Sequence, residues 1–583
     1  MNSYNIISSF GIDDRIKDRV QGQYPESIQF VLHGTDKNIS HGLDKLLKEL
    51  KISRLTDEVL DLYEIATIVY AADKKCGRGK REDWIRNMDF YIPVRNLIFW
   101  ETQKRLLEDM ISFLSGDNVR MNFSQYNSTC KSQIRRMYFR RRKQSRQWRE
   151  KFDNVDSVAL FSGGLDSTSG AIRLMGEGLN PILVKVTGDG SKASDIVKFI
   201  GDRLDKTIPH IHTQAKPSGG AAEESQRMRS FYFLSIAFFV ANRFDIKDIF
   251  INEHSIMTIH LPLTMSRIGS FSTHTAHPIF LDKFAQLANS LTDNKREFRV
   301  RNIFALATKG EVVDSICEDG FKDIIKHTSS CAHLNSIKQT IKNIDPKSQP
   351  LGNIHCGYCV PCVIRYFAVK QSKYNLEDKD DVEYYFSNNI LERFLSDEVN
   401  KSSGIAVDWL SSILGVMRLV NDFMQMNDIE LLIKYPEITE SEIIGLEALD
   451  IISVHRRFAR EIMSAINEKI PDYKFLIDKE FQKKYENDLK RFNFDDLLAS
   501  ILEETEINIK SAAYDKISKK LNDYRWIAQF AVMRGLIKPH QLQSTVHKFV
   551  SDIAKAAKER GKKNITSRDI GDDELCHCPP WTS

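Results

Sequence analysis

Apolar positions in residues 153–370 alternate between two spacings, one typical of buried strands and the other of helices. Short apolar runs predict strands at 155–161, 181–186 and 248–252. Three- and four-residue spacings predict helices between and after them, at 168–175, 194–204 and 230–243. Strands separated by helices indicate an α/β fold with a doubly wound parallel sheet. Such sheets bind ligands at the carboxyl ends of their strands.

The segments on either side have a different character. In residues 1–150 we expect an α+β accessory domain, with strands at 27–32, 88–94 and 119–123 and helices at 42–50, 55–72 and 97–114. After an acidic stretch at 376–385, residues 390–557 show helical periodicity and few glycines. The sequence therefore predicts three domains, at 1–150, 151–375 and 376–583, the last a helical domain for substrate or partner contacts.

Composition adds little beyond the class of protein. The chain has 583 residues, 42% of them hydrophobic and 28% charged, and its net charge of +4 identifies no partner. The longest apolar run, Phe233 to Ala241, is too short to cross a bilayer, and Met1 to Phe10 does not read as a secretion signal. We expect a cytoplasmic protein that contacts no membrane.

The stretch "LFSGGLDSTSG", Leu160 to Gly170, interrupts this pattern with a glycine-rich polar turn. It lies between a predicted strand and a predicted helix, where unpaired backbone N–H groups and the helix dipole favour an anion. Glycines let the backbone approach phosphates closely. The turn is neither a Walker A loop nor a GxGxxG motif. The alternative is a tight turn with an aspartate cap.

Cysteines form a second cluster. Cys356, Cys359 and Cys362 follow one another at C-x2-C steps, and Cys331 lies upstream. Four thiolates predict a tetrahedral structural zinc site, with a [4Fe–4S] cluster as the alternative. The histidines that can replace Cys331 as fourth ligand are His327, His333 and His355. We expect buried single thiols at Cys76, Cys130 and Cys317. Cys576 and Cys578 belong either to a frayed tail or to a metal site.

Residues 131–151, "KSQIRRMYFRRRKQSRQWREK", are strongly basic and include Tyr138, Phe139 and Trp148. Aromatic side chains between arginines can bind nucleic acid. The alternative is a linker and a solvated helix whose arginines face water or acidic neighbours.

Several of these motifs together carry a family resemblance. The Ser-Gly-Gly-Xaa-Asp-Ser loop resembles that of the PP-loop ATPases. With the C-x2-C-x2-C cluster, "RSFYFLSIA" at 229–237 and "KHTSSC" at 326–331, residues 153–370 resemble QueC, the 7-cyano-7-deazaguanine synthase family. The segment 252–278 is similar to the larger QueC-like proteins of bacterial anti-phage systems, most of all the QatC group of the Qat system. The 24 residues between Cys331 and Cys356 and the long segments outside the core depart from the housekeeping enzyme.

The resemblance implies roles for particular residues. The loop residues that would bind ATP phosphates are Ser162, Gly163, Gly164, Leu165, Asp166 and Ser167. Asp166 would also organise Mg²⁺, and Lys185 would lie near the adenine or ribose. Three further catalytic contacts are expected. Arg229 would meet phosphate or the substrate carboxylate, and Glu253 would contact the substrate base or act as an acid or base. Lys309, in the stretch "TKGE" that ends at Glu311, would contact phosphate. The residues left open between functional and structural roles are Arg267, Thr273, His274 and His277.

The implied function is that of an ATP-dependent C–N ligase. A 7-carboxy-7-deazaguanine-like carboxylate would be adenylated, and an amine would then displace AMP to give an amide or nitrile. In the anti-phage relatives the amine is associated with the N-terminus of a partner protein. The alternatives are a PP-loop enzyme that modifies a tRNA base, and a non-catalytic nucleotide-binding scaffold of a defence complex.

Overall fold

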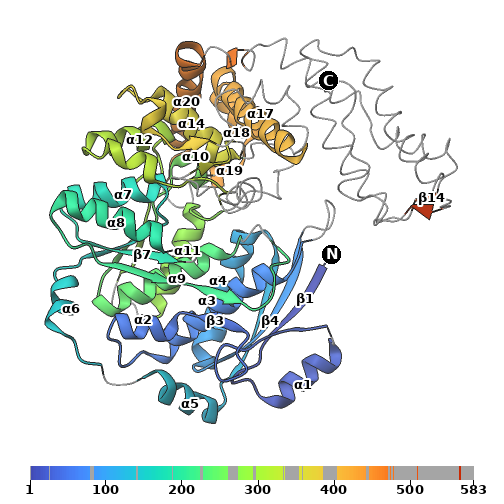
Figure 1. Ribbon diagram of the computed structural model, residues 1–583. Helices are drawn as coiled ribbons and strands as arrows, with labels where there is room; N and C mark the ends of the chain where they lie inside the picture. Colours follow the sequence, from blue (N-terminus) through green and yellow to red (C-terminus); the bar gives the residue numbers. More distant parts are fainter. Residues whose placement is uncertain are drawn as a thin grey trace. The chain divides into compact units, whose positions relative to one another are not determined.

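The structure is a computed structural model of the chain (Figure 1). The residues that it describes are 2–24, 26–78, 85–139, 142–186, 188, 190–223, 227–259, 261, 274–292, 297–332, 334, 354–357, 359–384, 403–440, 446–470, 473–474, 477, 508–509 and 564–565.

The chain divides into two compact units. Unit 1 comprises Met1–Ser329, Ser372–Asp381 and Asp422–Phe458. Unit 2 comprises Ser330–Gln371, Val382–Asn421 and Ala459–Ser583. The predicted three-domain division remains a prediction.

Unit 1 contains two parallel sheets. The first, which we call the N-terminal sheet, has the order β2-β1-β4-β5, and all of its pairs are parallel. Its strands are β1 (Asn2–Ser8), β2 (Ile28–Phe30), β4 (Arg86–Val94) and β5 (Asn118–Gln125). The helices of this part of the chain are α1 (Asp14–Gln23), α2 (Leu43–Glu49), α3 (Asp57–Lys75), α4 (Leu97–Ser115), α5 (Ser128–Tyr138) and α6 (Arg146–Lys151).

The expected strands and helices of residues 1–150 are present, but the expected α+β arrangement is wrong for this sheet. The sequence does not predict β1, which lies between β2 and β4 and pairs in parallel with both. The parallel pairs need crossover connections, so helices alternate with strands here as well. This part of the chain is therefore α/β.

The second sheet, which we call the central sheet, has the order β11-β10-β6-β7-β8 and is also entirely parallel. Its strands are β6 (Ser157–Leu160), β7 (Pro181–Val186), β8 (His210–Thr213), β10 (Asp248–Phe250) and β11 (Arg299–Arg301). The helices that accompany it are α7 (Leu165–Gly176), α8 (Ser191–Leu204), α9 (Arg229–Phe244), α10 (Ser255–Ile259), α11 (Pro278–Ser290), α12 (Lys309–Glu318) and the short η2 (Lys322–His327).

The topology of the central sheet confirms the predicted mixed α/β class with a parallel sheet. From β6 the chain proceeds to β7 and β8 on one side, and it then returns to β10 and β11 on the other side. Figure 1 shows α7 and α8 on one face of this sheet and α9 on the other. The order therefore reverses between β6 and β10, and the carboxyl ends of these two strands are the place where open α/β sheets bind ligands.

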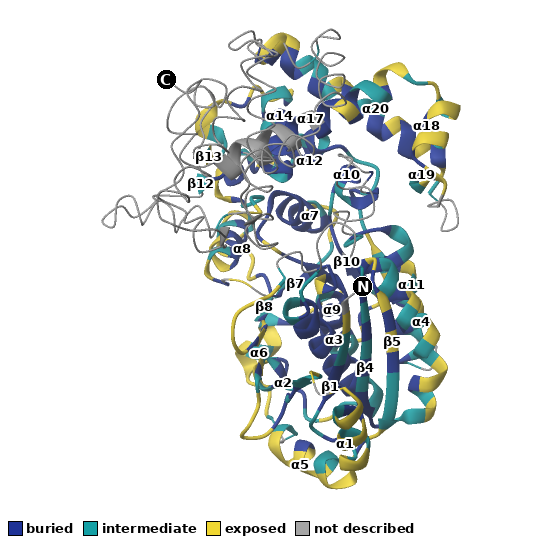
Figure 2. Cartoon of the chain, turned by 90° about the vertical axis from the view of Figure 1, so that its right-hand side faces the viewer, coloured by how far each residue is buried: buried dark blue, intermediate teal, exposed yellow. Residues whose placement is uncertain are grey.

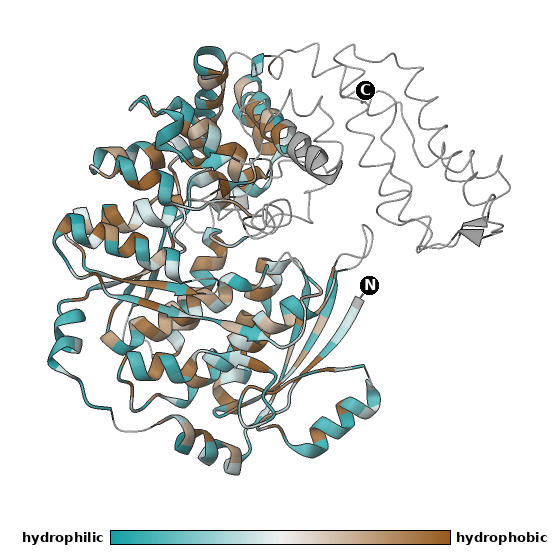
Figure 3. Ribbon diagram, in the orientation of Figure 1, coloured by the Kyte–Doolittle hydropathy of each residue, from teal (hydrophilic) through white to brown (hydrophobic). Residues whose placement is uncertain are grey.

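One hydrophobic core joins the two sheets of unit 1. Helices α3 and α9 pack against each other, and the rings of Tyr70 and Tyr232 stack at 5.0 Å. Short strand β3 (Ile39–His41) pairs antiparallel with β9 (Ala215–Pro217). Figure 2 shows both helices as buried, and Figure 3 shows the hydrophobic residues that they contribute. The long apolar helix predicted at 230–243 is thus an interior element of the fold.

The remaining described elements are mostly helical. They are β12 (Ile354–His355), α14 (Val360–Gln371), η3 (Asp378–Asp380), β13 (Glu383–Tyr384), α17 (Ser403–Gln425), α18 (Asp428–Lys434), α19 (Glu437–Glu440), α20 (Ala448–Ser464), the π-helical turn η5 (Ala465–Lys469), β14 (Asn508–Ile509) and β15 (Asn564–Ile565). Most of the predicted helical domain beyond residue 470 lies outside the described residues. Within the described part of the chain, no helix is long and apolar enough to cross a membrane.

Candidate functional site

The glycine-rich loop lies directly after β6, at the reversal point of the central sheet. Gly163 has φ of +78°, a left-handed conformation that favours glycine. A Cβ atom on Gly164 would lie 3.0 Å from the backbone oxygen of Ser329, so a side chain at this position would crowd the neighbouring backbone. Ser329 N also donates to the Gly163 oxygen at 3.0 Å. The backbone conformation therefore favours glycine at position 163, and the closeness of Ser329 favours a small residue at position 164.

Two serines fix the shape of the loop. The hydroxyl of Ser162 accepts from Gly164 N at 3.0 Å, and it lies 2.9 Å from the hydroxyl of Ser167. Ser167 Oγ accepts from Ser162 N at 3.2 Å and donates to the Gly164 oxygen at 3.1 Å. Lys185, on the adjacent strand β7, donates to the Ser162 oxygen at 2.5 Å. The predicted phosphate-binding residues thus form one closed turn.

Helix α7 begins at the end of this turn. Its cap residue is Gly164, so the N–H groups of its first turn receive no side-chain cap. Leu165, predicted with the loop, is fully buried and anchors the start of the helix. A helix N-terminus with uncapped N–H groups attracts an anion. The junction therefore has the chemistry expected for phosphate, as the sequence pattern indicates.

Asp166 and Lys309 form a buried ion pair beside the loop. Lys309 Nζ donates to Asp166 Oδ1 at 2.8 Å and to Oδ2 at 2.7 Å. The side chain of Lys309 is only 4% exposed. Burial opposes ionisation of Asp166, but the attraction and hydrogen bonds of Lys309 prevail and hold the Asp166 pKa below its usual value. The pair brings together two residues that the sequence placed separately at the site.

Glu253 is the third member of this cluster. It lies three residues beyond the end of β10 and shares a side-chain hydrogen bond with Asp166. Burial and the adjacent Asp166 carboxylate raise the Glu253 pKa, whereas Lys309 and Arg229 act in the opposite direction. Asp166 and Glu253 therefore compete for one negative charge, and the proton resides on Glu253.

The site also contains one residue that the sequence did not single out. His254 is buried, and after Lys309 it is the next electrostatic influence that lowers the Asp166 pKa. Only its position just after a predicted strand could have indicated it. Arg229 begins α9 and is exposed, close enough to Glu253 to act on its pKa. The structure thus brings Asp166, Glu253, Lys309 and Arg229 to one place.

The fit of Mg²⁺ depends on Asp166. Both of its oxygens bind Lys309, so the carboxylate is already neutralised before any cation arrives. Mg²⁺ usually keeps several waters and takes one or two carboxylates together with substrate phosphates. Asp166 is the carboxylate that the loop itself contributes, and its role as a Mg²⁺ ligand stays a prediction.

Other predicted site residues have structural contacts. His277 caps α11 by accepting from Ile279 N at 3.3 Å, and His274 stacks on Phe113 at 4.5 Å. Glu311 completes a capping box with Thr308 and accepts from Arg457 Nε at 2.7 Å. The predicted residues that lie outside the described part of the chain are Arg267 and Thr273.

The four cysteines predicted as metal ligands meet within unit 2. The Sγ atoms of Cys331, Cys356, Cys359 and Cys362 all lie within 4.8 Å of one another. Cys356 Sγ lies 3.8 Å from Cys362 Sγ. A tetrahedral ion with metal–sulfur bonds of about 2.3 Å requires sulfur–sulfur distances of about 3.8 Å. The cluster therefore fits a single ion such as zinc. Its sulfur atoms lie closer together than they would if each bound a different iron of a [4Fe–4S] cluster.

Backbone N–H groups support this cluster. Cys356 N donates to Cys331 Sγ at 3.3 Å, and Cys359 N donates to Cys356 Sγ at 3.4 Å. Gly357, between these ligands, has φ of +82°, which permits the tight turn. Hydrogen bonds of this kind orient thiolates and disperse their charge. The surroundings of the cysteines therefore suit a bound metal ion such as zinc.

The histidines considered as substitutes for Cys331 are not part of the cluster in the described residues. His355 Nε2 accepts from Ser330 N at 3.4 Å, and His327 packs against Phe199 at 6.0 Å. His333 lies outside the described residues, as do Cys576 and Cys578. Cys76 is a buried single thiol as predicted, whereas Cys130 and Cys317 are partly exposed. Cys331 is therefore the fourth member.

The aromatic residues of the basic segment are engaged in packing. Trp148 Nε1 donates to the Glu49 oxygen at 2.7 Å, and its ring stacks on Phe244. The hydroxyl of Tyr138 lies 3.1 Å from His33 Nδ1. Arg142 donates to the Tyr138 oxygen at 2.9 Å. Tyr138 and Trp148 are thus partly buried and pack against the core of unit 1.

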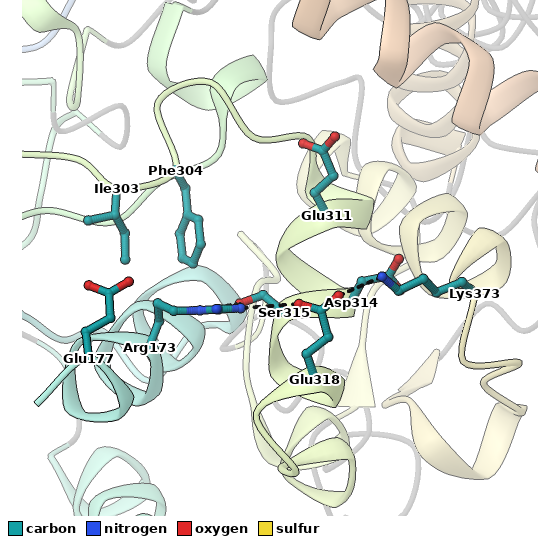
Figure 4. Close-up of a pocket in the computed structure, with 9 residues that line it drawn as sticks. All are labelled: Arg173, Glu177, Ile303, Phe304, Glu311, Asp314, Ser315, Glu318 and Lys373. Carbon is teal, nitrogen blue, oxygen red and sulfur yellow. Dashed lines mark hydrogen bonds and ion pairs between the residues drawn. The ribbon is translucent and has the colours of Figure 1, made fainter.

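A pocket of about 420 Å³ lies at the other end of α7 (Figure 4). It is lined by Arg173, Glu177, Ile303, Phe304, Glu311, Asp314, Ser315, Glu318 and Lys373. Arg173 is seven residues beyond Asp166, about 10 Å along the helix at 1.5 Å per residue. The charged side chains that line the pocket are largely paired with one another, as in the 2.6 Å contact of Lys373 with Glu318. The pocket is therefore separate from the candidate site.

Comparison with known proteins assigns no family: no family model matches this chain, and no curated protein matches it. The likeness to QueC-like proteins accordingly rests on the motifs themselves.

Proposed function

We propose that this protein is an ATP-dependent ligase that adenylates the carboxylate of a 7-carboxy-7-deazaguanine-like substrate and transfers the acyl group to an amine. The observation that carries the proposal is the convergence of the closed Ser162–Ser167 turn, Asp166, Lys309 and Glu253 at the reversal point of a parallel sheet. Open α/β sheets bind their ligands at this place.

The first step requires an electrophilic α-phosphate. The substrate carboxylate oxygen attacks the α-phosphorus of ATP, the bond to the bridging oxygen breaks, and pyrophosphate leaves with the electron pair. The turn and the first N–H groups of α7 would hold the β- and γ-phosphates, and Lys309 would neutralise charge that develops on the leaving group. Mg²⁺, when bound with ATP, supplies further charge neutralisation. Asp166 holds Lys309 in position until ATP arrives.

The second step requires an amine. It attacks the carbonyl carbon of the acyl-adenylate, the bond to the AMP oxygen breaks, and the amine loses a proton to a nearby base or to water. An N-terminal amine of a partner protein from the same defence system is the proposed acceptor, by likeness to the anti-phage QueC-like proteins. Tyr138 and Trp148 pack against the core, so the aromatic residues of the basic segment give no support to tRNA as the acceptor.

Pyrophosphate release tests the first step. The wild-type protein, ATP, Mg²⁺ and 7-carboxy-7-deazaguanine should give pyrophosphate, and Asp166→Ala should abolish its release. Asp202→Ala, which changes an exposed aspartate on α8, is the matched control and should retain the wild-type rate. An Asp166→Ala protein that releases pyrophosphate at the wild-type rate would refute the role of the loop.

Mass spectrometry of co-expressed proteins and bound RNA tests the acceptor. A partner protein whose N-terminus gains the mass of the acylated deazaguanine supports the proposal. Deletion of residues 478–583 should remove this modification and leave pyrophosphate release with free substrate intact. A modified base in bound tRNA, with salt-sensitive tRNA binding, would instead identify a tRNA-modifying enzyme.

A further inference from the structure

The side chain of Asn252 is an exception to the rule that buried polar groups are hydrogen-bonded. It is 2% exposed, and among the described residues neither its Oδ1 nor its Nδ2 has a hydrogen-bond partner. Leaving both ends of an amide unpaired in the interior is costly, and such groups in native proteins call for an explanation. Ser255, three residues further on, also buries a hydroxyl without a partner in the described structure.

The backbone around Asn252 is, by contrast, well bonded. Asn302 accepts from Glu253 N at 3.2 Å and donates to the Glu253 oxygen at 2.7 Å. Thr258 Oγ1 donates to the same oxygen at 2.9 Å. The segment that follows β10 is thus fixed in place, and the amide of Asn252 is held where it is although it gains no hydrogen bond there.

A glycine on α7 makes room for this amide. A Cβ atom on Gly170 would lie 2.1 Å from Asn252 Nδ2 and 2.4 Å from its Cγ. Gly170 is four residues after Asp166 on the same helix, and residues at this spacing lie on one face, about 5–6 Å apart. The unpaired amide therefore lies one helical turn from the carboxylate that joins Lys309 and Glu253.

We infer that Asn252 recognises the heterocycle of the substrate through paired hydrogen bonds, with Oδ1 accepting and Nδ2 donating. An asparagine amide matches a ligand edge that offers one donor next to one acceptor. The pyrimidinone ring of a deazaguanine has such an edge, since its ring N–H adjoins its carbonyl oxygen. This inference rests on the proposed function, because it takes the substrate class from it.

Adenine also offers a donor beside an acceptor, but the order of the strands favours the substrate. Asn252 follows β10, which lies on one side of β6, whereas Lys185 is on β7, on the other side. Lys185 is the residue expected near the adenine or ribose. Asn252 is next in sequence to Glu253, the residue assigned to the substrate. Substrate and adenine should therefore lie on opposite sides of the loop, with Asn252 on the substrate side.

The test compares Asn252→Leu, which has nearly the same volume and no polar group, with Thr168→Val in the full-length protein. Thr168 also buries a hydroxyl that has no partner among the described residues. It lies two positions after Asp166 on α7, and residues at this spacing do not share a face of the helix. Asn252→Leu should raise the KM for 7-carboxy-7-deazaguanine by about 10- to 100-fold and leave the KM for ATP within about twofold. Thr168→Val should leave both KM values unchanged.

Thermal unfolding adds a readout that a purely structural role would not produce. Asn252→Leu should not lower the unfolding temperature of the ligand-free protein, because it removes two unpaired polar groups, yet it should lose stabilisation by the substrate. If the leucine variant does not fold, Asn252→Ala provides the same KM comparison. An unchanged substrate KM in the variant that folds, or an increase in the KM for ATP alone, would overturn the inference.

Failure of the proposed function has a different signature. In that case wild-type protein would release no pyrophosphate with any carboxylated deazaguanine. The assignment of Asn252 is then decided by the thermal shift that 7-deazaguanine itself produces. Stabilisation of wild type and Thr168→Val but not of Asn252→Leu supports it, and equal shifts or no shift in all three overturn it.

Discussion

Lys309 donates hydrogen bonds to both carboxylate oxygens of Asp166, although 143 positions of sequence separate the two residues. The contact joins the first turn of α7 to the first turn of α12. Because both side chains are buried, each charge depends on the other for compensation.

Breaking this pair should destabilise unit 1 more than removing it altogether. Lys309→Met leaves the Asp166 carboxylate buried without its cation, and we expect a loss of about 3 kcal/mol in the free energy of unfolding. The double variant Asp166→Asn, Lys309→Met should lose clearly less than the sum of the single variants. Denaturant titrations of the four proteins measure this coupling.

Lys373→Met is the control for that series, since its ion pair with Glu318 involves a side chain that is 60% exposed. It should leave the free energy of unfolding nearly unchanged, because exposed ion pairs contribute little to stability. Additive effects of Asp166→Asn and Lys309→Met would contradict the interpretation that the two charges depend on each other.

Two glycines of α7 should respond in opposite directions to the same substitution. Gly170→Ala places a Cβ atom 2.1 Å from Asn252 Nδ2, and we expect it to cost about 1–3 kcal/mol. Gly176→Ala meets no atom within 4 Å and should stabilise the protein by about 0.5–1 kcal/mol. Thermal unfolding of both variants checks the pair. Equal effects would show that α7 and Asn252 are not in close contact.

Metal analysis should find about one zinc ion per chain, as one cluster of four cysteines in the described residues requires. Cys359→Ser should lower zinc content and reduce soluble yield, because a structural metal contributes directly to folding. Cys317→Ser, outside the cluster, is the matched control and should retain the metal. Iron together with a visible absorption band would contradict the assignment to zinc.

Stability should fall in mild acid partly because of His455. Its ring is 1% exposed and stacks on Phe423, and burial lowers its pKa to about 4. The unfolded chain, with a histidine pKa of about 6.5, takes up a proton first as pH falls. His455 therefore makes its full contribution to the free energy of unfolding above pH 6.5. This contribution, up to about 3 kcal/mol, is lost between about pH 6.5 and 4.

His455→Phe keeps the ring contact and removes the titrating group. Its free energy of unfolding should equal that of the wild type near pH 8 and should decline less steeply below pH 6.5. Urea titrations at several pH values provide the comparison. Parallel curves for the two proteins would mean that His455 is not responsible.

The features predictable from sequence are those whose residues lie close together in the chain. The loop could be placed because Ser162 to Ser167 follow a strand directly, and the metal cluster because Cys356, Cys359 and Cys362 have ligand spacing. Strands β6 and β7 were predicted from continuous apolar runs, which buried parallel strands produce.

Features that depend on distant contacts could not be predicted in this way. Strand β1 has only Ile6 and Ile7 as fully buried aliphatic residues among serines and asparagines, and it owes its place to pairing on both sides. The partner of Lys309 and the space that Gly170 leaves for Asn252 arise from the packing of α7, α12 and the end of β10. Neither relationship leaves a local pattern.

The pairing of β3 with β9 has a consequence for synthesis of the chain. Ile39–His41 leaves the ribosome roughly 170 residues before its partner Ala215–Pro217. At about 5–20 residues per second this delay is roughly 10–35 s. Helix α3 waits about as long for α9, which packs against it in the finished protein. During that interval the nascent N-terminal segment displays apolar surface that only later translation can cover, which makes it a natural client for ribosome-associated chaperones.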